Sequence, residues 1–222
     1  MNTNILRLIA LLLGTSLLAG CRPTDPAKVK FQETSARAGL GDASAQTDLG
    51  LMYVSGQGVA RDDAEAVKWF RKAAEQNNPV AQFNLAVSYT TGEGVARNGS
   101  EAVKWFRKAA DQGHADAQFN LGVAHAQGVL VPKNLTETLK WFRLAAEQNH
   151  AEAQSKLAFL YATGAGVPRD AILAHAWWNL AAGNGDPEAR KNLEKLEKEM
   201  RPQEMNQAVK LANELSVKFK KN

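Results

Sequence analysis

The chain has 222 residues, a single cysteine and a formal net charge of +4. One cysteine excludes an internal disulfide, because a disulfide needs two. The positive surplus lies at the end of the chain, where residues 190–222 hold nine Lys or Arg against five Asp or Glu, while residues 22–189 hold 17 against 18. Such a charged run is usually a solvated face, with contact to anionic lipid or a partner as the alternative. No nucleic-acid recognition motif accompanies it, so we expect no nucleic-acid partner.

Residues 1–20 have the pattern of a secretory signal peptide. Arg7 precedes an apolar run from Leu8 to Leu18, and a positive charge followed by about 7 to 15 apolar residues is typical of such a signal. The run is too short for a membrane-spanning helix, which needs about 20 residues. We therefore expect the mature protein to be exported.

The end of this run is similar to a bacterial lipobox. It reads Leu18-Ala19-Gly20-Cys21, and the resemblance implies cleavage before Cys21 and a lipid on its sulfur. An ordinary signal peptide with an incidental cysteine is the alternative. Arg22, not an aspartate, follows the cysteine, which under the sorting rule of enteric lipoproteins implies the outer membrane, facing the periplasm. Residues 21–35 are then expected to form a lipidated tether.

Residues 36–189 repeat with a fixed period. Four tryptophans stand 36 residues apart, at Trp69, Trp105, Trp141 and Trp177. A fixed period of 20 to 50 residues is typical of solenoids, whose units bury a shared core by stacking on one another. We predict four full repeats with flanking half-repeats.

Each repeat is predicted to hold two helices. In the first copy, small and apolar residues recur with helical spacing in both halves. They are Ala45, Leu49, Gly50 and Tyr53, and then Ala66, Trp69, Phe70, Ala73 and Ala74. A glycine such as Gly56 is expected to end the first helix, and a short polar residue such as Asp62 to cap the second. Both signals recur in all four copies.

The repeated pattern resembles the Sel-one-like repeat family, a relative of the tetratricopeptide repeats. It reads A-Q-x-x-L-G-x-x-Y-x-x-G-x-G-V, followed by A-x-x-W-F-x-x-A-A. The resemblance implies an all-α, right-handed superhelical solenoid of antiparallel helix pairs, in which the first helix of each pair lines the concave side. Copy three departs from it, because His125 replaces the tyrosine and Leu130 the second glycine. The turn at residues 128–132 is therefore expected to follow a different path.

After the fourth copy the pattern decays. Residues 190–222 are predicted to form a C-terminal helical cap, because a terminal repeat has to present a polar outer face.

The sequence carries no motif of a metalloprotease, a serine hydrolase or a phosphate-binding loop. We therefore expect no catalytic residue, no cofactor and no metal site. His114 and His150 occupy the same position in two copies and are expected to be exposed turn residues. His125 and His175 are expected to fill structural positions.

Candidates for partner binding are the residues of the first helices that change along the array. They form a polar row and an apolar row: Asp48, Asn84, Asn120 and Lys156, and then Leu51, Val87, Val123 and Phe159. The alternative is packing between repeats for the apolar members and plain solvation for the polar ones.

Three functions fit these patterns. The first is a lipid-anchored periplasmic scaffold without catalysis, held at the membrane through Cys21, that binds a protein partner on its concave surface. The second is an inhibitor that neutralises a periplasmic toxin, because some lipoproteins of this repeat family resemble immunity proteins against secreted phospholipases. The third is a β-lactamase-like hydrolase, a role linked to cysteine-rich family members. Those members carry cysteine pairs in each repeat, and this chain has none.

Overall fold

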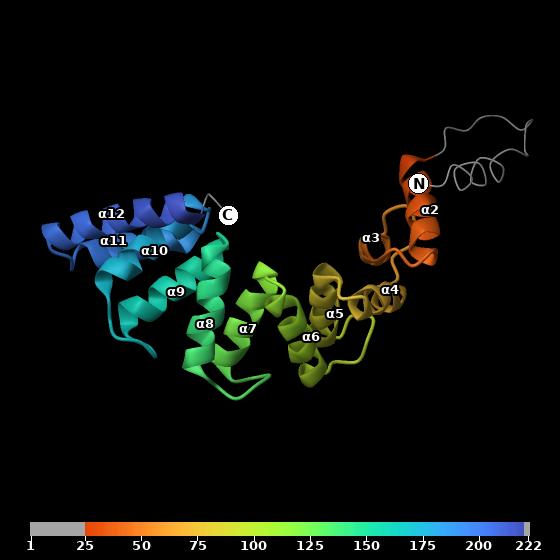
Figure 1. Ribbon diagram of the computed structural model, residues 1–222, viewed down its shortest axis with the longest axis horizontal. Helices are drawn as coiled ribbons and strands as arrows, with labels where there is room; N and C mark the ends of the chain where they lie inside the picture. Colours follow the sequence, from red (N-terminus) through yellow and green to blue (C-terminus); the bar gives the residue numbers. More distant parts are fainter. Residues whose placement is uncertain (1–24, 220–222) are drawn as a thin grey trace, which may run out of the picture.

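The computed structural model describes residues 25–219, which form eleven helices and no strand. The helices follow one another along a curved array, with α2 at one end and α11 and α12 at the other (Figure 1). They are α2 (Pro26–Gly39), α3 (Ala43–Ser55), α4 (Asp63–Glu75), α5 (Pro79–Thr91), α6 (Gly99–Asp111), α7 (Ala115–Gln127), α8 (Leu135–Glu147), α9 (Ala151–Thr163), α10 (Ala171–Gly183), α11 (Pro187–Glu197) and α12 (Pro202–Phe219). The predicted signal peptide and Cys21 lie outside the described residues.

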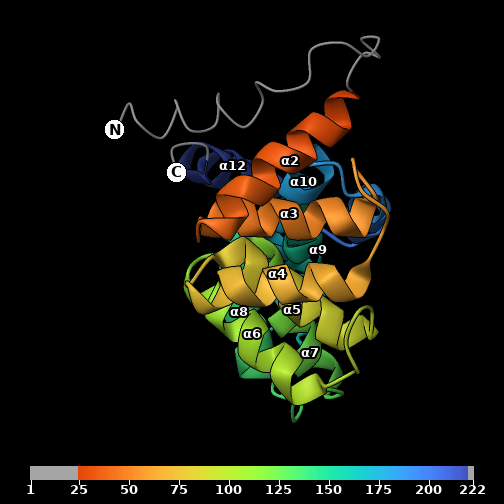
Figure 2. The same ribbon diagram turned by 90° about the vertical axis from the view of Figure 1, so that its right-hand side faces the viewer.

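Each helix from α3 to α10 packs on the helix before it and the helix after it, as a solenoid requires. The closest pairs are the two helices of one repeat: α3 with α4, α5 with α6, α7 with α8, and α9 with α10. Viewed from the end that carries α2, the first three helices lie one below another (Figure 2). The all-α solenoid of helix pairs is confirmed. None of the helices between residues 25 and 219 is long and apolar enough to cross a bilayer.

The predicted helix ends are confirmed in every copy. Each first helix ends at a glycine with a positive φ, between 71° and 86°. Each second helix begins after an Asp or Asn whose side chain accepts the backbone N–H three residues on, as Asp62 accepts from Glu65 at 2.9 Å. These bonds satisfy amides that the first helical turn leaves without a partner. The repeat length is thus set by two signals at fixed positions.

The tether is shorter than predicted. Helix α2 begins at Pro26, well inside the range 21–35, because the side chain of Asp25 caps it by accepting the Ala27 amide at 3.0 Å. Proline at the first helical position is favourable, since its missing N–H would have no partner there. Pro26, within the range expected to be a tether, therefore starts a helix.

The tryptophans belong to the core, with one difference along the array. Trp105, Trp141 and Trp177 are buried, and the indole N–H of Trp105 and of Trp141 donates to the glutamate four residues before it. Trp69 is half-buried, because it packs at the edge of the small N-terminal cluster that α2 covers only in part.

A ladder of buried glutamines links every repeat to the next. The side-chain amide of Gln82 donates to the Ala74 carbonyl at 3.1 Å, and its oxygen accepts from Gln112, 30 residues further on, at 2.7 Å. The same two bonds recur at Gln46, Gln118 and Gln154, with Asn184 as the last donor. We call these four residues the glutamine ladder. Buried amides keep their place at low cost only when their hydrogen bonds are made, so the ladder fixes the register of the repeats.

The turn of copy three does follow a different path. In copy two, the second glycine, Gly94, has a positive φ of 70°, and a β-carbon there would lie 2.0 Å from the Asp63 carbonyl oxygen at the start of α4. Leu130 has no positive φ, and its side chain lies over Gly99 at the start of α6. The larger residue in one repeat therefore faces a glycine in the preceding repeat.

His125 keeps the buried position of the tyrosine but not its hydrogen bond. The hydroxyl of Tyr89 accepts a bond from Arg71 at 2.7 Å, whereas neither ring nitrogen of His125 has a partner among the described residues. Its role as a structural filler is consistent with burial to 7% exposure.

His114 and His150 are not exposed turn residues. Each caps a first helix: Nδ1 of His150 accepts the Ala153 amide at 3.2 Å, and Nδ1 of His114 accepts the Ala117 amide at 3.4 Å. Each ring also stacks on a phenylalanine of the preceding first helix, with centroids 4.7 to 4.8 Å apart. The two histidines therefore connect neighbouring first helices.

The C-terminal cap folds back onto α10. Where α4 and α6 carry Lys72 and Lys108, α10 carries Leu180, and apolar residues cover most of this helix, with Asn179 exposed. Helix α12 packs along α10, and its Phe219 stacks on Trp177 with ring centroids 5.7 Å apart. A helix with so wide an apolar surface has to be covered on more than one side, and α12 supplies part of that cover.

We expect Gln118→Leu to destabilise the solenoid by about 1 to 3 kcal/mol, because it removes two hydrogen bonds of a buried amide, one to the Ala110 carbonyl and one from the Gln148 side chain. Urea unfolding followed by circular dichroism measures the change. Gln57→Leu, at an exposed glutamine, is the matched control and should stay within about 0.5 kcal/mol of the parent. Equal stability of the two variants would contradict the role of the ladder.

We expect His114 to make stability depend on pH. Burial lowers its pKa below the usual value, and the Asp116 carboxylate opposes the shift only in part. The unfolded chain then binds the proton more readily, so this stability is present above about pH 6.5 and is lost as the pH falls toward the folded pKa. Protonated Nδ1 also cannot accept the capping bond.

His114→Asn tests this, because Asn78 caps the equivalent helix α5. Melting temperatures are compared at pH 7.5 and pH 5.5. The parent should lose about 1 to 4 °C more than the variant on acidification. An equal loss in both proteins would show that His114 does not carry the effect.

Candidate interaction groove

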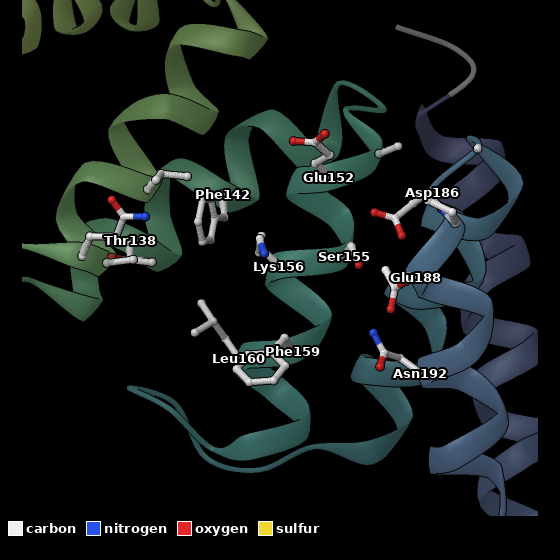
Figure 3. Close-up of a pocket in the computed structure, with 16 residues that line it drawn as sticks. Thr138, Phe142, Glu152, Ser155, Lys156, Phe159, Leu160, Asp186, Glu188 and Asn192 are labelled. Atoms are coloured by element: carbon white, nitrogen blue, oxygen red, sulfur yellow. The ribbon is translucent and has the colours of Figure 1, made fainter. Parts of the chain in front are cut away.

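A cavity lies along the first helices of the C-terminal half. It has a volume of about 930 Å³ and is lined by residues of α7, α9 and α11, with two side chains of α8 (Figure 3). Because α7, α9 and α11 are first helices of successive repeats, this hollow runs across the first-helix face of the array. We call it the C-terminal groove.

The apolar part of the groove is formed by α7, α8 and α9. Phe142 and Leu160 are buried in the core beneath it, and Val123 is half-buried. Phe159 is 53% exposed, the most exposed aromatic ring among the described residues. The ring lines the cavity rather than filling a place in the core.

The charged part of the groove lies toward α11. Carboxylates of Glu152, Asp186 and Glu188 line it, and the ammonium of Lys156 lies between them and the apolar part (Figure 3). Asp186 also caps α11 by accepting the Ala189 amide at 2.7 Å. Glu188 lies 3.7 Å from Lys191, on the same helix.

The predicted partner-binding residues divide into three groups. Val123, Lys156 and Phe159 lie together in the C-terminal groove. Asn120 and Val123 line a neighbouring hollow of about 360 Å³, which also reaches the altered turn at Val129 and Leu130. The remaining four, Asp48, Leu51, Asn84 and Val87, lie on α3 and α5, outside both cavities.

Packing accounts for several members of the two rows. Val87 and Val123 pack against the core clusters, as the alternative interpretation stated. The side-chain amides of Asn84 and Asn120 donate to carbonyls one turn earlier in their own helices, at 2.9 and 2.7 Å. Leu51 and Asp48 are exposed, with Leu51 at 40%.

The sequence interpretation missed the acidic side of the groove. Residues 186–192 were taken as part of a decaying copy, yet Asp186, Glu188 and Asn192 complete the cavity wall. A signal was present, because the second position of the first helices becomes acidic along the chain. It reads Ser44, Val80, Asp116, Glu152 and Glu188, each 36 residues after the last.

Within residues 25–219, no group of three or more His, Cys, Asp or Glu side chains is arranged to hold a metal ion. His150 has a carboxylate partner, with Nε2 3.2 Å from an oxygen of Asp116. His175 has another, with Nε2 3.1 Å from Glu197 on α11. The first contact joins the first helices α7 and α9, and the second joins α10 and α11. Both contacts therefore link neighbouring helices of the solenoid.

Solved structures similar to this chain share its fold. A Sel1 repeat protein from Oxalobacter formigenes has 35% identity and a TM-score of 0.72, over 84% of this chain and 76% of that one. A protective antigen present in uropathogenic Escherichia coli strains, with an SLR fold, has 29% identity and a TM-score of 0.54, over 87% of this chain and 57% of that one. An immunity protein of Pseudomonas aeruginosa has 18% identity and a TM-score of 0.55, over 98% of this chain and 83% of that one, a likeness of fold alone.

A search of curated proteins gave no match. The Sel1 repeat family matches four consecutive segments, residues 43–78, 79–114, 115–150 and 151–186. Each segment holds one helix pair, from α3 and α4 to α9 and α10. The chain therefore belongs to the Sel1 repeat family.

Proposed function

We propose that this protein is a lipid-anchored scaffold of the periplasm that binds a protein partner in the C-terminal groove, without catalysis. Sel1 repeat proteins are generally interaction scaffolds. The observation that carries the proposal is Phe159, a half-exposed aromatic ring above a hollow of about 930 Å³. Aromatic residues of this kind form the centres of protein interfaces.

The anchor is supported by the sequence alone. The apolar run ending in Leu18-Ala19-Gly20-Cys21 precedes the first described helix by only a few residues. Because α2 begins at Pro26, the proposed tether holds the solenoid close to the membrane surface. Arg22 after the cysteine favours the outer membrane.

The second candidate is an inhibitor of a secreted toxin. The immunity protein of Pseudomonas aeruginosa has the same fold across nearly the whole of this chain, which supports the candidate at the level of shape. A tight one-to-one complex with the product of a neighbouring toxin gene would favour it over a scaffold with several partners.

A photo-crosslinking amino acid at position 159 should capture the partner in intact cells. We expect a discrete crosslinked product, identified by mass spectrometry, that disappears when the same reporter is used together with Lys156→Ala and Val123→Ala. The reporter at Lys104, an exposed residue of the second helix α6, is the control for the opposite face. Capture at position 104 and not at 159 would contradict binding in the groove.

Cys21→Ser should release the protein from the membrane fraction and abolish labelling by a palmitate analogue. The substituted residue precedes α2, so the helical circular dichroism signal should not change. Label retained by the variant would mean that Cys21 carries no lipid, and the anchor would have to be abandoned.

A further inference from the structure

We infer that the C-terminal groove takes a cationic peptide segment with an apolar or aromatic anchor, contributed by the partner. This rests on the proposed function and adds the chemistry of the partner. The positive residues of the segment lie toward α11, and its anchor lies on Phe159, two turns along α9 from Glu152.

The acidic side of the groove holds charges that the solenoid does not neutralise. Glu152 and Asp186 have no lysine or arginine within ion-pair distance among residues 25–219, and Glu188 has only Lys191, at 3.7 Å. Elsewhere on the described surface, carboxylates at the starts of the second helices pair locally: Glu65 with Lys68, and Glu101 with Lys104. A ligand that brings cations to the groove would supply the missing partners.

Helix capping and the helix dipole favour each of these three carboxylates locally. Asp186 caps α11, and Glu152 and Glu188 lie in the first turns of α9 and α11, where negative charge is favourable. These local effects do not place the carboxylates on one cavity, and the corresponding second positions of α3 and α5 carry the uncharged Ser44 and Val80. The two sides of the cavity, α9 and α11, bring the negative charges together only at this end of the array.

The apolar side fixes where an anchor would lie. Phe142, Phe159 and Leu160 lie away from Asp186 and Glu188 in the groove (Figure 3), which Val123 also lines. Lys156 lies between the two parts and has no ion pair among the described residues. Its charge disfavours a positive residue in the middle of the segment, so the cations and the anchor of the ligand are separated along its length.

Three heptapeptides provide the test. One carries two arginines at one end and a phenylalanine at the other, the second has glutamates in place of the arginines, and the third has alanine in place of the phenylalanine. Binding to the full-length chain is measured by ¹H–¹⁵N NMR titration. We expect the first peptide to bind most tightly, with shifts confined to α7, α9 and α11, and to weaken as salt is added.

Glu152→Gln, Asp186→Asn and Glu188→Gln are combined in one variant that removes three charges and keeps the shapes. Asparagine is a native cap at Asn78, so α11 should remain folded. We expect about a tenfold loss of affinity for the cationic peptide, since each exposed pair contributes modestly. The matched control removes three exposed charges outside the groove, with Glu33→Gln, Glu75→Gln and Asp111→Asn, and should bind as the parent does.

Equal binding of the acidic peptide, or full affinity in the groove variant, would overturn the inference. Binding that appears only after residues 220–222 are deleted would assign the groove to the chain's own Lys220 and Lys221, and would overturn it as well. The proposed function is judged separately. If a partner is crosslinked at position 159 through a segment without positive charge, binding in the groove stands and only the cationic nature of the segment is wrong.

Discussion

The glutamine ladder is the interaction on which the rest of the structure depends. Solenoid repeats touch only their neighbours, so the shape of the whole array follows from one interface repeated several times. Most of that interface consists of alanines and leucines, which tolerate sliding because their contacts have no direction. A buried amide with two required hydrogen bonds has direction, and it admits one register. Gln82 therefore decides how far α6 is displaced from α5, and its equivalents decide the same at each step.

The ladder also explains which residues are allowed to vary. Because groups in the core fix the register, the exposed positions of the first helices can differ from one repeat to the next. Gly94 and Leu130 show the limit of that freedom, because each loop lies against the start of the second helix of the preceding repeat. There a change in one repeat requires a matching change in its neighbour, as the leucine over Gly99 shows. At the position of Lys156, by contrast, Asp48, Asn84 and Asn120 occur with no compensation elsewhere.

The sequence predicted what is local and missed what is brought together by folding. Gly56 and Asp62 mark helix ends through their own backbone preferences, so the fold could be predicted from their spacing. The bond between Gln82 and Gln112 spans 30 residues, and only the packing of α5 against α6 shows that the two side chains meet. The stack of His114 on Phe83 was missed for the same reason. Helix α2 was expected as an N-terminal half-repeat, but its start was missed, because Asp25 and Pro26 are an ordinary helix start and were taken as part of the tether.

The position of the groove follows from how the array ends. A regular fifth repeat would place a second helix behind α11, and the chain does not continue that way. Instead α12 turns back along α10, where Leu180 and Trp177 need cover. This arrangement leaves Asp186, Glu188 and Asn192 of α11 facing α9 across the cavity. The cap thus closes the core on one side and provides the acidic wall of the groove on the other. The hollow at this end has an apolar and an acidic wall because two helices share the work of closing the array. Helix α12 covers α10, and α11 ends the repeat.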